Sequence, residues 1–313
     1  MVAARRSFVQ ASVELHVTPS AVSLQIKELE QTLGLPLFKR QAKAVLLTPA
    51  GEVLLADVRR VLNAMQHADD TLARLHGDDA GSVSIGMVSN AKYFLPGLLA
   101  RFRDEHRGIE LQLSVANREQ LLNQLQRGQV DLAVMGMPPQ EFAARADPFA
   151  TQPLGIVVSP AHPLVGQRAV PVAALTNVEF IVREPGSGTR AAMDRYFRDV
   201  QVEPQRMMEM NCNEAIKQAV MASMGLAFLS LPTVDFELRE QMLMALDVVG
   251  LPIVRRWFVV SVGVARLTRA AEDLRRFILD RGAPLLSQQL GKLRNLAPTA
   301  AAHGITSDRR ERL

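Results

Sequence analysis

The sequence predicts an α+β N-terminal part, then one long helix, then an α/β part with two lobes. Three observations predict this order. Residues 8–47 contain two short helical patterns and a pair of strand-like segments, and residues 54–75 carry an apolar residue at every third or fourth position. From residue 82 strand-like and helical segments alternate. A chain of 313 residues has room for two or three domains.

The first two helices are separated by a tight turn. Residues 8–15, "FVQASVEL", form the first, and "HVT" leads into a second that Thr18 caps, with Pro19 in its first turn. Gly34 and Pro36 end this second helix. Successive residues of an α-helix are rotated by about 100°, which sorts the side chains of this helix onto two different faces. One face is apolar and the other is small and polar: Val22, Ile26, Leu29 and Leu33 against Ser20, Ser23, Leu24 and Lys27.

Two short strands around a basic tip follow in "LFKRQAKAVLLT", which is typical of a wing beside a helix-turn-helix. Small hydroxyl groups would let the second helix enter a DNA major groove, and the cations of the tip suit phosphates. The alternative is a helix packed on the protein itself, with its serines tolerated. The order of helix, turn, wing and stalk favours DNA. The predicted DNA-binding residues are Thr18, Pro19, Ser20, Ser23, Leu24 and Lys27 on the helix and Lys39, Arg40 and Lys43 on the wing.

Thr48 and Pro49 open the long helix, which "HGDDAGS" ends. Its apolar residues step by four and three, as in a heptad seam: Leu54, Val58, Val61, Met65, Ala68, Leu72 and Leu75. Packing on its own domain would also bury such a seam. No segment nearby offers a partner face of this length, so pairing of two chains is favoured.

The second half alternates strands such as "SVSIGMVS", "VDLAVMG" and "GLAFLS" with helices, which predicts parallel α/β sheets in two lobes with a cleft between them. The helix in "TRAAEDLRRFILDRG" could return to the first sheet. After Leu293 the composition predicts disorder.

Helix N-termini near strand ends are where open α/β folds bind ligands, and flanking cations favour anions. "VSNAKYF", "REPGSGTR" and "NCNEAIKQ" supply such ends. "GSGT" lacks the Lys of a phosphate-binding Walker loop. Capping alone would equally explain Ser89 and Asn213. The candidates are Ser89, Asn90, Lys92, Gly186, Ser187, Gly188, Thr189, Arg190 and Asn213.

Composition excludes several classes of protein. The chain is 48% hydrophobic and 22% charged with a net charge of +4, which permits nucleic-acid contact without requiring it. Cys212 is the single cysteine, so no intramolecular disulfide or disulfide switch is expected. No signal peptide or spanning segment is evident, which predicts a cytoplasmic protein without membrane contact. The six histidines make no metal-binding pair and no catalytic set can be placed, so neither metal, cofactor nor enzymatic activity is predicted.

The run "SFVQASVELHVTPSAVSLQIKELEQTLGLPLFKR…LLTPAG" resembles the DNA-binding domain of LysR-type transcriptional regulators, and the similarity extends to about residue 290. The resemblance implies a winged helix-turn-helix, a dimerising linker helix and a periplasmic-binding-protein-like effector domain. It further implies a homodimer assembled into a homotetramer, promoter DNA bent in response to a small co-inducer, and RNA polymerase as a further partner. The expected domains are 1–47, 48–77 and 82–290, with a tail at 291–313. Lobe I would comprise 82–154 and 264–290, and lobe II 155–263.

The family has a further helix before the segment matching Phe8, of which "MVAARRS" leaves room for the last turn. A start site set too late is the favoured explanation, and Phe8, Val9 and Val13 would lose cover.

"REPGSGTR", "NEAIKQAVMASMGLAFLS" and "DLAVMGMPP" resemble the subgroup that regulates Calvin-cycle (RuBisCO) operons, whose effectors are anionic or phosphorylated metabolites. These motifs add Gly136 and Glu214 to the effector candidates. Cys212 stands where that subgroup more often has a serine. The alternative is a cytoplasmic α/β small-molecule-binding or enzymatic protein whose N-terminal segment mediates only assembly.

Overall fold

A computed structural model describes residues 1–41, 44–75, 81–263 and 267–291. The chain divides into two compact units, one of Met1–Leu75 and Gln126–Gln129 and the other of His76–Leu125 and Val130–Leu313. Each unit is described by itself. No helix in the described ranges is both long and apolar enough to cross a membrane.

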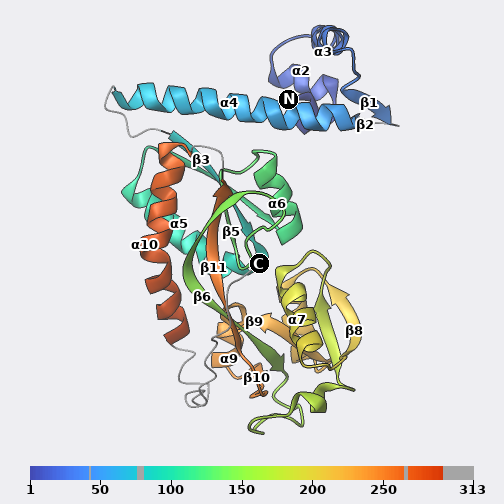
Figure 1. The fold of residues 1–313 in the computed structure, drawn as a ribbon, viewed down its shortest axis with the longest axis vertical. Helices are drawn as coiled ribbons and strands as arrows, with labels where there is room; N and C mark the ends of the chain where they lie inside the picture. The colour runs from blue at the N-terminus through green and yellow to red at the C-terminus, as the bar shows by residue number, and fades with distance from the viewer. Residues whose placement is uncertain (42–43, 76–80, 264–266, 292–313) are drawn as a thin grey trace. The chain divides into compact units, whose positions relative to one another are not determined.

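The N-terminal unit has the predicted order of elements (Figure 1). Thr18 caps α3, because its Oγ1 accepts the Ala21 N–H at 3.2 Å, and Gly34 ends the helix. The expected helix-turn-helix and hairpin are therefore confirmed. The elements are α1 (Val2–Arg5), α2 (Phe8–Glu14), α3 (Pro19–Leu33), β1 (Phe38–Gln41), β2 (Ala44–Leu47) and α4 (Pro49–Leu75).

The core of this unit is small. Val2, Ala11 and Val22 are buried, and partly buried residues that include Phe8 and Ile26 pack around them. Leu29 and Leu33 share a helix face with Val22 but are 42% and 44% exposed, so the apolar face of α3 is covered only at its N-terminal end. Of the three residues predicted to lose cover, Val9 and Val13 are exposed, whereas Phe8 is partly buried and packs against this core.

The second unit is built on one nine-stranded mixed sheet in the order β4-β3-β5-β11-β6-β9-β7-β8, with β10 paired to β6 (Figure 1). The parallel pairs join β3 to β4 and β5, and β7 to β8 and β9. The strands are β3 (Gly81–Val88), β4 (Ile109–Ala116), β5 (Leu132–Met135), β6 (Ala144–Val158), β7 (Glu179–Arg183), β8 (Gln205–Met210), β9 (Leu226–Ser230), β10 (Met244–Ala245) and β11 (Ile253–Val262).

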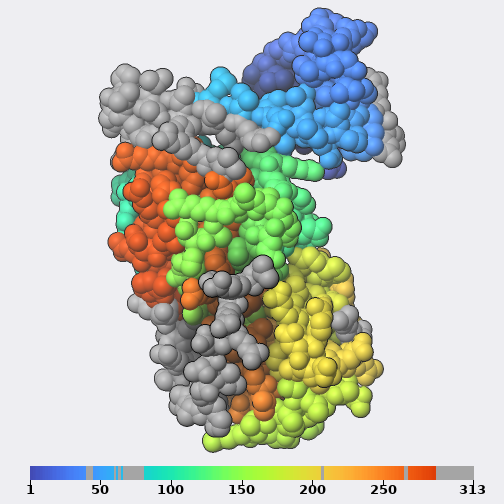
Figure 2. All heavy atoms as spheres, in the orientation of Figure 1, coloured from blue at the N-terminus to red at the C-terminus, as the bar shows by residue number. Residues whose placement is uncertain are grey.

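Helices pack on this sheet and form separate hydrophobic cores in the two lobes. Leu98 of α5 and Leu274 of α10 pack with β3 in the first lobe, so the last helix returns there as predicted, and Figure 2 shows α10 in orange-red on the surface of that lobe. Phe197 of α7 and Ile216 of α8 pack in the second lobe. The helices are η1 (Ser89–Tyr93), α5 (Leu95–Glu105), α6 (Arg118–Gln126), η2 (Val172–Leu175), α7 (Gly188–Asp199), α8 (Asn213–Met221), η3 (Leu231–Val234), α9 (Asp235–Arg239) and α10 (Arg269–Gly291).

Two strands differ from the prediction of purely parallel sheets. β11 runs antiparallel to both β5 and β6, and β6 runs antiparallel to β9. β11 was expected in the second lobe, within 155–263, but its residues Phe258–Val260 pair with β5 of the first lobe. The two lobes therefore share β6 and β11. The crossing in β6 falls between Phe149 and Leu154, near the expected boundary at 154, whereas the crossing in β11 falls between Ile253 and Trp257, before the expected boundary at 263. The predicted disorder after Leu293 lies outside the described residues.

Candidate functional site

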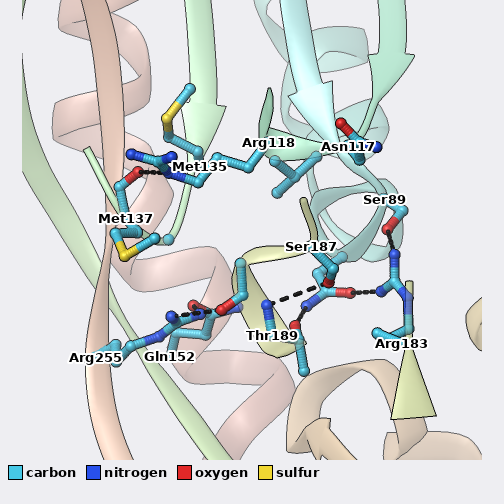
Figure 3. Close-up of a pocket in the computed structure, with 14 residues that line it drawn as sticks. Ser89, Asn117, Arg118, Met135, Met137, Gln152, Arg183, Ser187, Thr189 and Arg255 are labelled. Carbon is cyan, nitrogen blue, oxygen red and sulfur yellow. Dashed lines mark hydrogen bonds between the residues drawn. The ribbon is translucent and has the colours of Figure 1, made fainter. Parts of the chain in front are cut away.

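A pocket lies where the two lobes of the second unit meet, and it encloses about 350 Å³ up to its open mouth. Its walls come from the ends of β3, β5 and β7, the first turns of η1, α6 and α7, and the interior of β6 and β11 (Figure 3). This is the edge at which parallel strands end and ligands bind in α/β folds. Six predicted residues line it: Ser89, Asn90, Gly136, Ser187, Gly188 and Thr189.

The first turn of α7 is held by its own cap. Ser187 Oγ accepts the N–H groups of Thr189 and Arg190 at 3.3 and 3.5 Å. Gly186 precedes it with a φ of +80°, and a Cβ there would lie 2.8 Å from the Glu119 carboxylate. Only glycine fits this turn without strain. "GSGTR" therefore presents the positive end of a twelve-residue helix to the pocket.

A buried polar network connects the lobes behind this turn. Arg183 Nη1 donates to Asn213 Oδ1 at 2.7 Å, and Arg183 Nη2 donates to Ser89 Oγ at 3.2 Å. Asn90 Oδ1 accepts from Asn213 Nδ2 at 2.7 Å, and Asn90 Nδ2 donates to Thr189 Oγ1 at 2.9 Å. Ser89 and Asn90 belong to the first lobe and the other three residues to the second. Asn213 is thus part of the network behind the pocket and does not line it.

Arg118 enters the pocket from the first turn of α6, and its charge is compensated. Its Nη1 lies 3.0 Å from Glu141 Oε1, and its Nε and Nη2 donate to the carbonyl oxygens of Met137 and Pro138. The hydrogen bond from Arg118 lowers the pKa of Glu141 to about 2. Arg118 and Glu141 therefore form an ion pair at neutral pH.

Arg255 enters from β11 on another side of the pocket (Figure 3). Its Nη1 donates to Gly188 O at 2.9 Å and its Nη2 to Gln152 Oε1 at 3.1 Å. Its Nε is buried without a hydrogen-bond partner in the described part of the chain. Burial, with Arg195 and Arg118 nearby, lowers the pKa of Arg255 to about 10, so the side chain is charged at neutral pH.

The remaining predicted effector residues lie outside the pocket. Gly186 and Arg190 line an adjoining hollow, and Arg190 pairs with Asp194. Lys92 of η1 and Glu214 of α8 form an ion pair with each other at 3.2 Å. This pair bridges the two lobes away from the pocket, and Glu214 also pairs with Lys217.

Five polar residues that line the pocket were not predicted: Asn117, Arg118, Gln152, Arg183 and Arg255. Two had usable signals, because Arg183 begins "REPGSGTR" at a strand end and Arg118 opens a helix after a strand. Arg255 had none. Its partners Gly188 and Gln152 are 67 and 103 residues away in the sequence.

The predicted DNA-reading face of α3 is accessible within the chain. Ser20, Leu24 and Lys27 are exposed and Ser23 is half-buried. Thr18 and Pro19 form the first turn, where the Thr18 hydroxyl serves as the cap. Lys39 is exposed on β1, whereas Lys43 and the side chain of Arg40 lie outside the described residues.

Known families match both parts of the chain. The model described as "Bacterial regulatory helix-turn-helix protein, lysR family" matches residues 1–52, and "LysR substrate binding domain" matches residues 76–283. The helix-turn-helix, the long helix and the two-lobed unit with its pocket define a transcriptional regulator of this class. The chain belongs to the LysR family of transcriptional regulators.

Its relatives include HTH-type transcriptional regulators and RuBisCO operon transcriptional regulators. The HTH-type transcriptional regulator CfxR of Cupriavidus necator is 42% identical over 93% of this chain and 92% of its own length. The HTH-type transcriptional regulator CbbR of Rhodospirillum rubrum is 46% identical over 88% and 92%. Among solved structures, the regulatory domain of Synechocystis PCC6803 CcmR in complex with 2-PG is 34% identical with a TM-score of 0.62, over 64% of this chain and 96% of that one.

Proposed function

We propose that this chain regulates CO2-fixation genes, and that a small anionic or phosphorylated metabolite in the pocket between its lobes changes its promoter binding. The observation that carries the proposal is the meeting of Arg118, Arg183 and Arg255 with the N-terminus of α7 in one pocket. Guanidinium N–H donors and a helix N-terminus together favour an anion. The relatives described as RuBisCO operon transcriptional regulators support the choice of target genes.

The effector is proposed to be a compact metabolite, because the pocket is narrow and hydrogen bonds between the lobes hold its walls together. The CcmR regulatory domain, described in complex with 2-PG, is a precedent for a small ligand. We assign Ser187, Gly188, Thr189, Asn90 and Ser89 to contact with the effector or its immediate supports. Gly136 belongs to the same wall, whereas Lys92, Gly186, Arg190, Asn213 and Glu214 have supporting positions around the pocket.

On the DNA side, α3 would enter the major groove with Ser20, Ser23, Leu24 and Lys27 towards the bases. A groove about 12 Å wide admits a helix whose outer face is small, and Lys27 can reach guanine or the backbone. Lys39, with Arg40 and Lys43, would neutralise neighbouring phosphates. Thr18 and Pro19 would set the start of the helix at the groove.

We infer that two chains pair through α4 and that dimers assemble into a homotetramer. Val58, Val61 and Met65 of the heptad seam are 41%, 60% and 60% exposed in the single chain, which is typical of a helix that lacks its partner. The side chains of Ala68, Leu72 and Leu75 lie outside the described residues. The regulator would act on promoter DNA in the cytoplasm, with RNA polymerase as a further partner, and without catalysis, as its relatives are regulators.

Gel-shift titration of RuBisCO-operon promoter DNA with the full chain tests the proposal. We expect Lys27→Ala to lose about 1–3 kcal/mol of binding free energy, because one base or phosphate contact is removed. Gln25→Ala, which removes an exposed side chain on another face of α3, is the matched control and should leave the affinity unchanged. We expect 2-phosphoglycolate to shift the promoter affinity of the wild-type chain.

Equal affinity of Lys27→Ala and the wild type would contradict the assigned DNA face. A promoter affinity that responds to no small phosphate or carboxylate would contradict the effector part of the proposal. The two parts can therefore fail separately.

A further inference from the structure

The three arginines of the pocket differ in how much of their charge is available. Arg183 is buried, and its Nε lies 2.7 Å from Glu184 Oε2. Arg118 lies 3.0 Å from Glu141. Each of these two cations is neutralised by a carboxylate of the protein, so neither adds a net charge to the pocket.

Arg255 is different, because its protein partners are neutral. It donates to the carbonyl oxygens of Gly188 and Gln152, and no carboxylate of the described residues pairs with it. A guanidinium has five N–H donors. Two of them are used here, and Nε is buried without an acceptor.

The surroundings of Arg255 are unfavourable to its charge. Burial and the nearby cations Arg118 and Arg195 both oppose it. A desolvated cation without a counter-ion costs free energy, and the cost is offset when an anion arrives. The uncompensated charge therefore favours an occupant that carries a negative charge of its own.

We propose that Arg255 is the specificity-determining residue of the pocket and holds an oxyanion of the effector, either a phosphate or a carboxylate. This inference rests on the proposed binding of a small anion in the same pocket. Gln152 and the Gly188 carbonyl are positioning groups, since each fixes one Nη atom of Arg255 at the junction of β11, β6 and α7. Arg118 and Arg183 support the pocket as hydrogen-bond donors but do not select for charge.

Calorimetric titration of the full-length wild type, Arg255→Gln and Arg195→Gln with 2-phosphoglycolate tests the proposal. We expect Arg255→Gln to bind at least tenfold more weakly, because a charge-assisted hydrogen bond is lost. Arg195 is exposed and lies near Arg255 without lining the pocket. Arg195→Gln removes the same charge and should change the affinity by less than twofold. Separate titrations with inorganic phosphate and with glycolate identify which oxyanion depends on Arg255.

Thermal unfolding separates this role from a structural one. Removal of an uncompensated cation should leave the ligand-free melting temperature of Arg255→Gln at or above that of the wild type, while stabilisation by 2-phosphoglycolate is lost. A lower melting temperature with stabilisation retained would overturn the proposal. Arg255→Lys keeps the charge without the planar donor set and should bind with intermediate affinity.

The failure of this inference is distinguishable from that of the proposed function. A wild type that binds none of the three anions would overturn both. A wild type that binds 2-phosphoglycolate while Arg255→Gln binds it equally well would overturn only the role of Arg255. Equal losses in Arg255→Gln and Arg195→Gln would also overturn it, because a diffuse positive field would then explain the affinity.

Discussion

At the scale of single residues, the pocket depends on the absence of a side chain at Gly136. This residue follows β5, and a Cβ there would lie 2.1 Å from Gln152 Oε1 and 3.2 Å from Arg255 Nη2. Gln152 is buried, and the atom that a Cβ at Gly136 would displace is the same Oε1 that accepts from Arg255. Gly136 therefore allows the Gln152–Arg255 hydrogen bond to form.

Gly136→Ala should lower the free energy of unfolding by about 1–3 kcal/mol, the usual cost of overpacking a filled site. It should also weaken 2-phosphoglycolate binding, since Gln152 is displaced from Arg255. Gly97→Ala is the matched control. A Cβ at Gly97 meets no atom within 4 Å, and alanine in the helix should stabilise by about 0.5–1 kcal/mol. Urea denaturation measures the free energy of unfolding of both variants. Equal stability of Gly136→Ala and the wild type would contradict the argument.

Single residues were also where prediction from the sequence was least complete. Ser187 and Thr189 were found because a glycine-rich turn before a helix is a local signal. Arg255 could not be found that way, because its role depends on the antiparallel pairing of β11 with β6 and on Gly136 at the end of β5. These contacts join distant parts of the chain, and no spacing in the sequence indicates them.

At the scale of elements, η1 and α8 are joined by charge as well as by the buried amide network. Glu214 in the first turn of α8 lies 3.2 Å from Lys92 of η1 and 2.7 Å from Lys217 of its own helix. The Tyr93 hydroxyl donates to the same carboxylate, and Lys217 also pairs with Glu237 at 2.8 Å. Burial raises the pKa of Glu214, but hydrogen bonds from Lys217, Tyr93 and Lys92 outweigh it and lower the pKa to about 2.

This ion cluster predicts a pH dependence of stability. The folded pKa of Glu214 lies below its unfolded value of about 4.3, so its stabilisation is complete above that pH and is lost as the pH falls through about 2. Because the side chain is 48% exposed, Glu214→Gln should cost only about 0.5–1 kcal/mol at pH 7. The difference from the wild type should vanish near pH 2.

Chemical denaturation of the full chain at pH 7, 4 and 2 measures the effect. Glu240→Gln is a suitable control, since Glu240 is an exposed glutamate for which no ion pair occurs in the described ranges. A difference between Glu214→Gln and the wild type that is the same at every pH would rule out titration of this carboxylate as the cause.

Element boundaries followed local chemistry and were largely predictable. Thr18, Pro19 and Gly34 mark the ends of α3 in the sequence as they do in the structure. The length of β6 was underestimated from the sequence, because Pro148 and Pro153 interrupt its strand pattern. In the structure the strand continues from Ala144 to Val158 beside β11. For the same reason the sequence did not indicate that the two lobes share β6 and β11.

At the scale of the whole molecule, the proposed DNA binding would use two copies of α3, and α4 is the element that would pair them. Val61→Glu should raise the dissociation constant of the dimer at least tenfold, because a charge would be buried in the apolar seam. Sedimentation analysis of the full chain measures this. Val53→Glu is the matched control, because Val53 is 67% exposed and lies outside the heptad positions. Pairing through this seam would be contradicted if the two variants had the same dissociation constant, whether raised or unchanged.

The two strands shared by the lobes also define how the lobes can move. Phe149 of β6 packs in the core of the first lobe, and Leu154 of the same strand packs in the core of the second. β11 follows it in antiparallel register from Ile253, with a single irregularity between Trp257 and Phe258. The ladder of backbone hydrogen bonds resists sliding, so rotation of one lobe against the other is a torsion of this paired ribbon. An effector that closes the pocket would therefore twist β6 between Phe149 and Leu154, and this segment would be the hinge between the lobes.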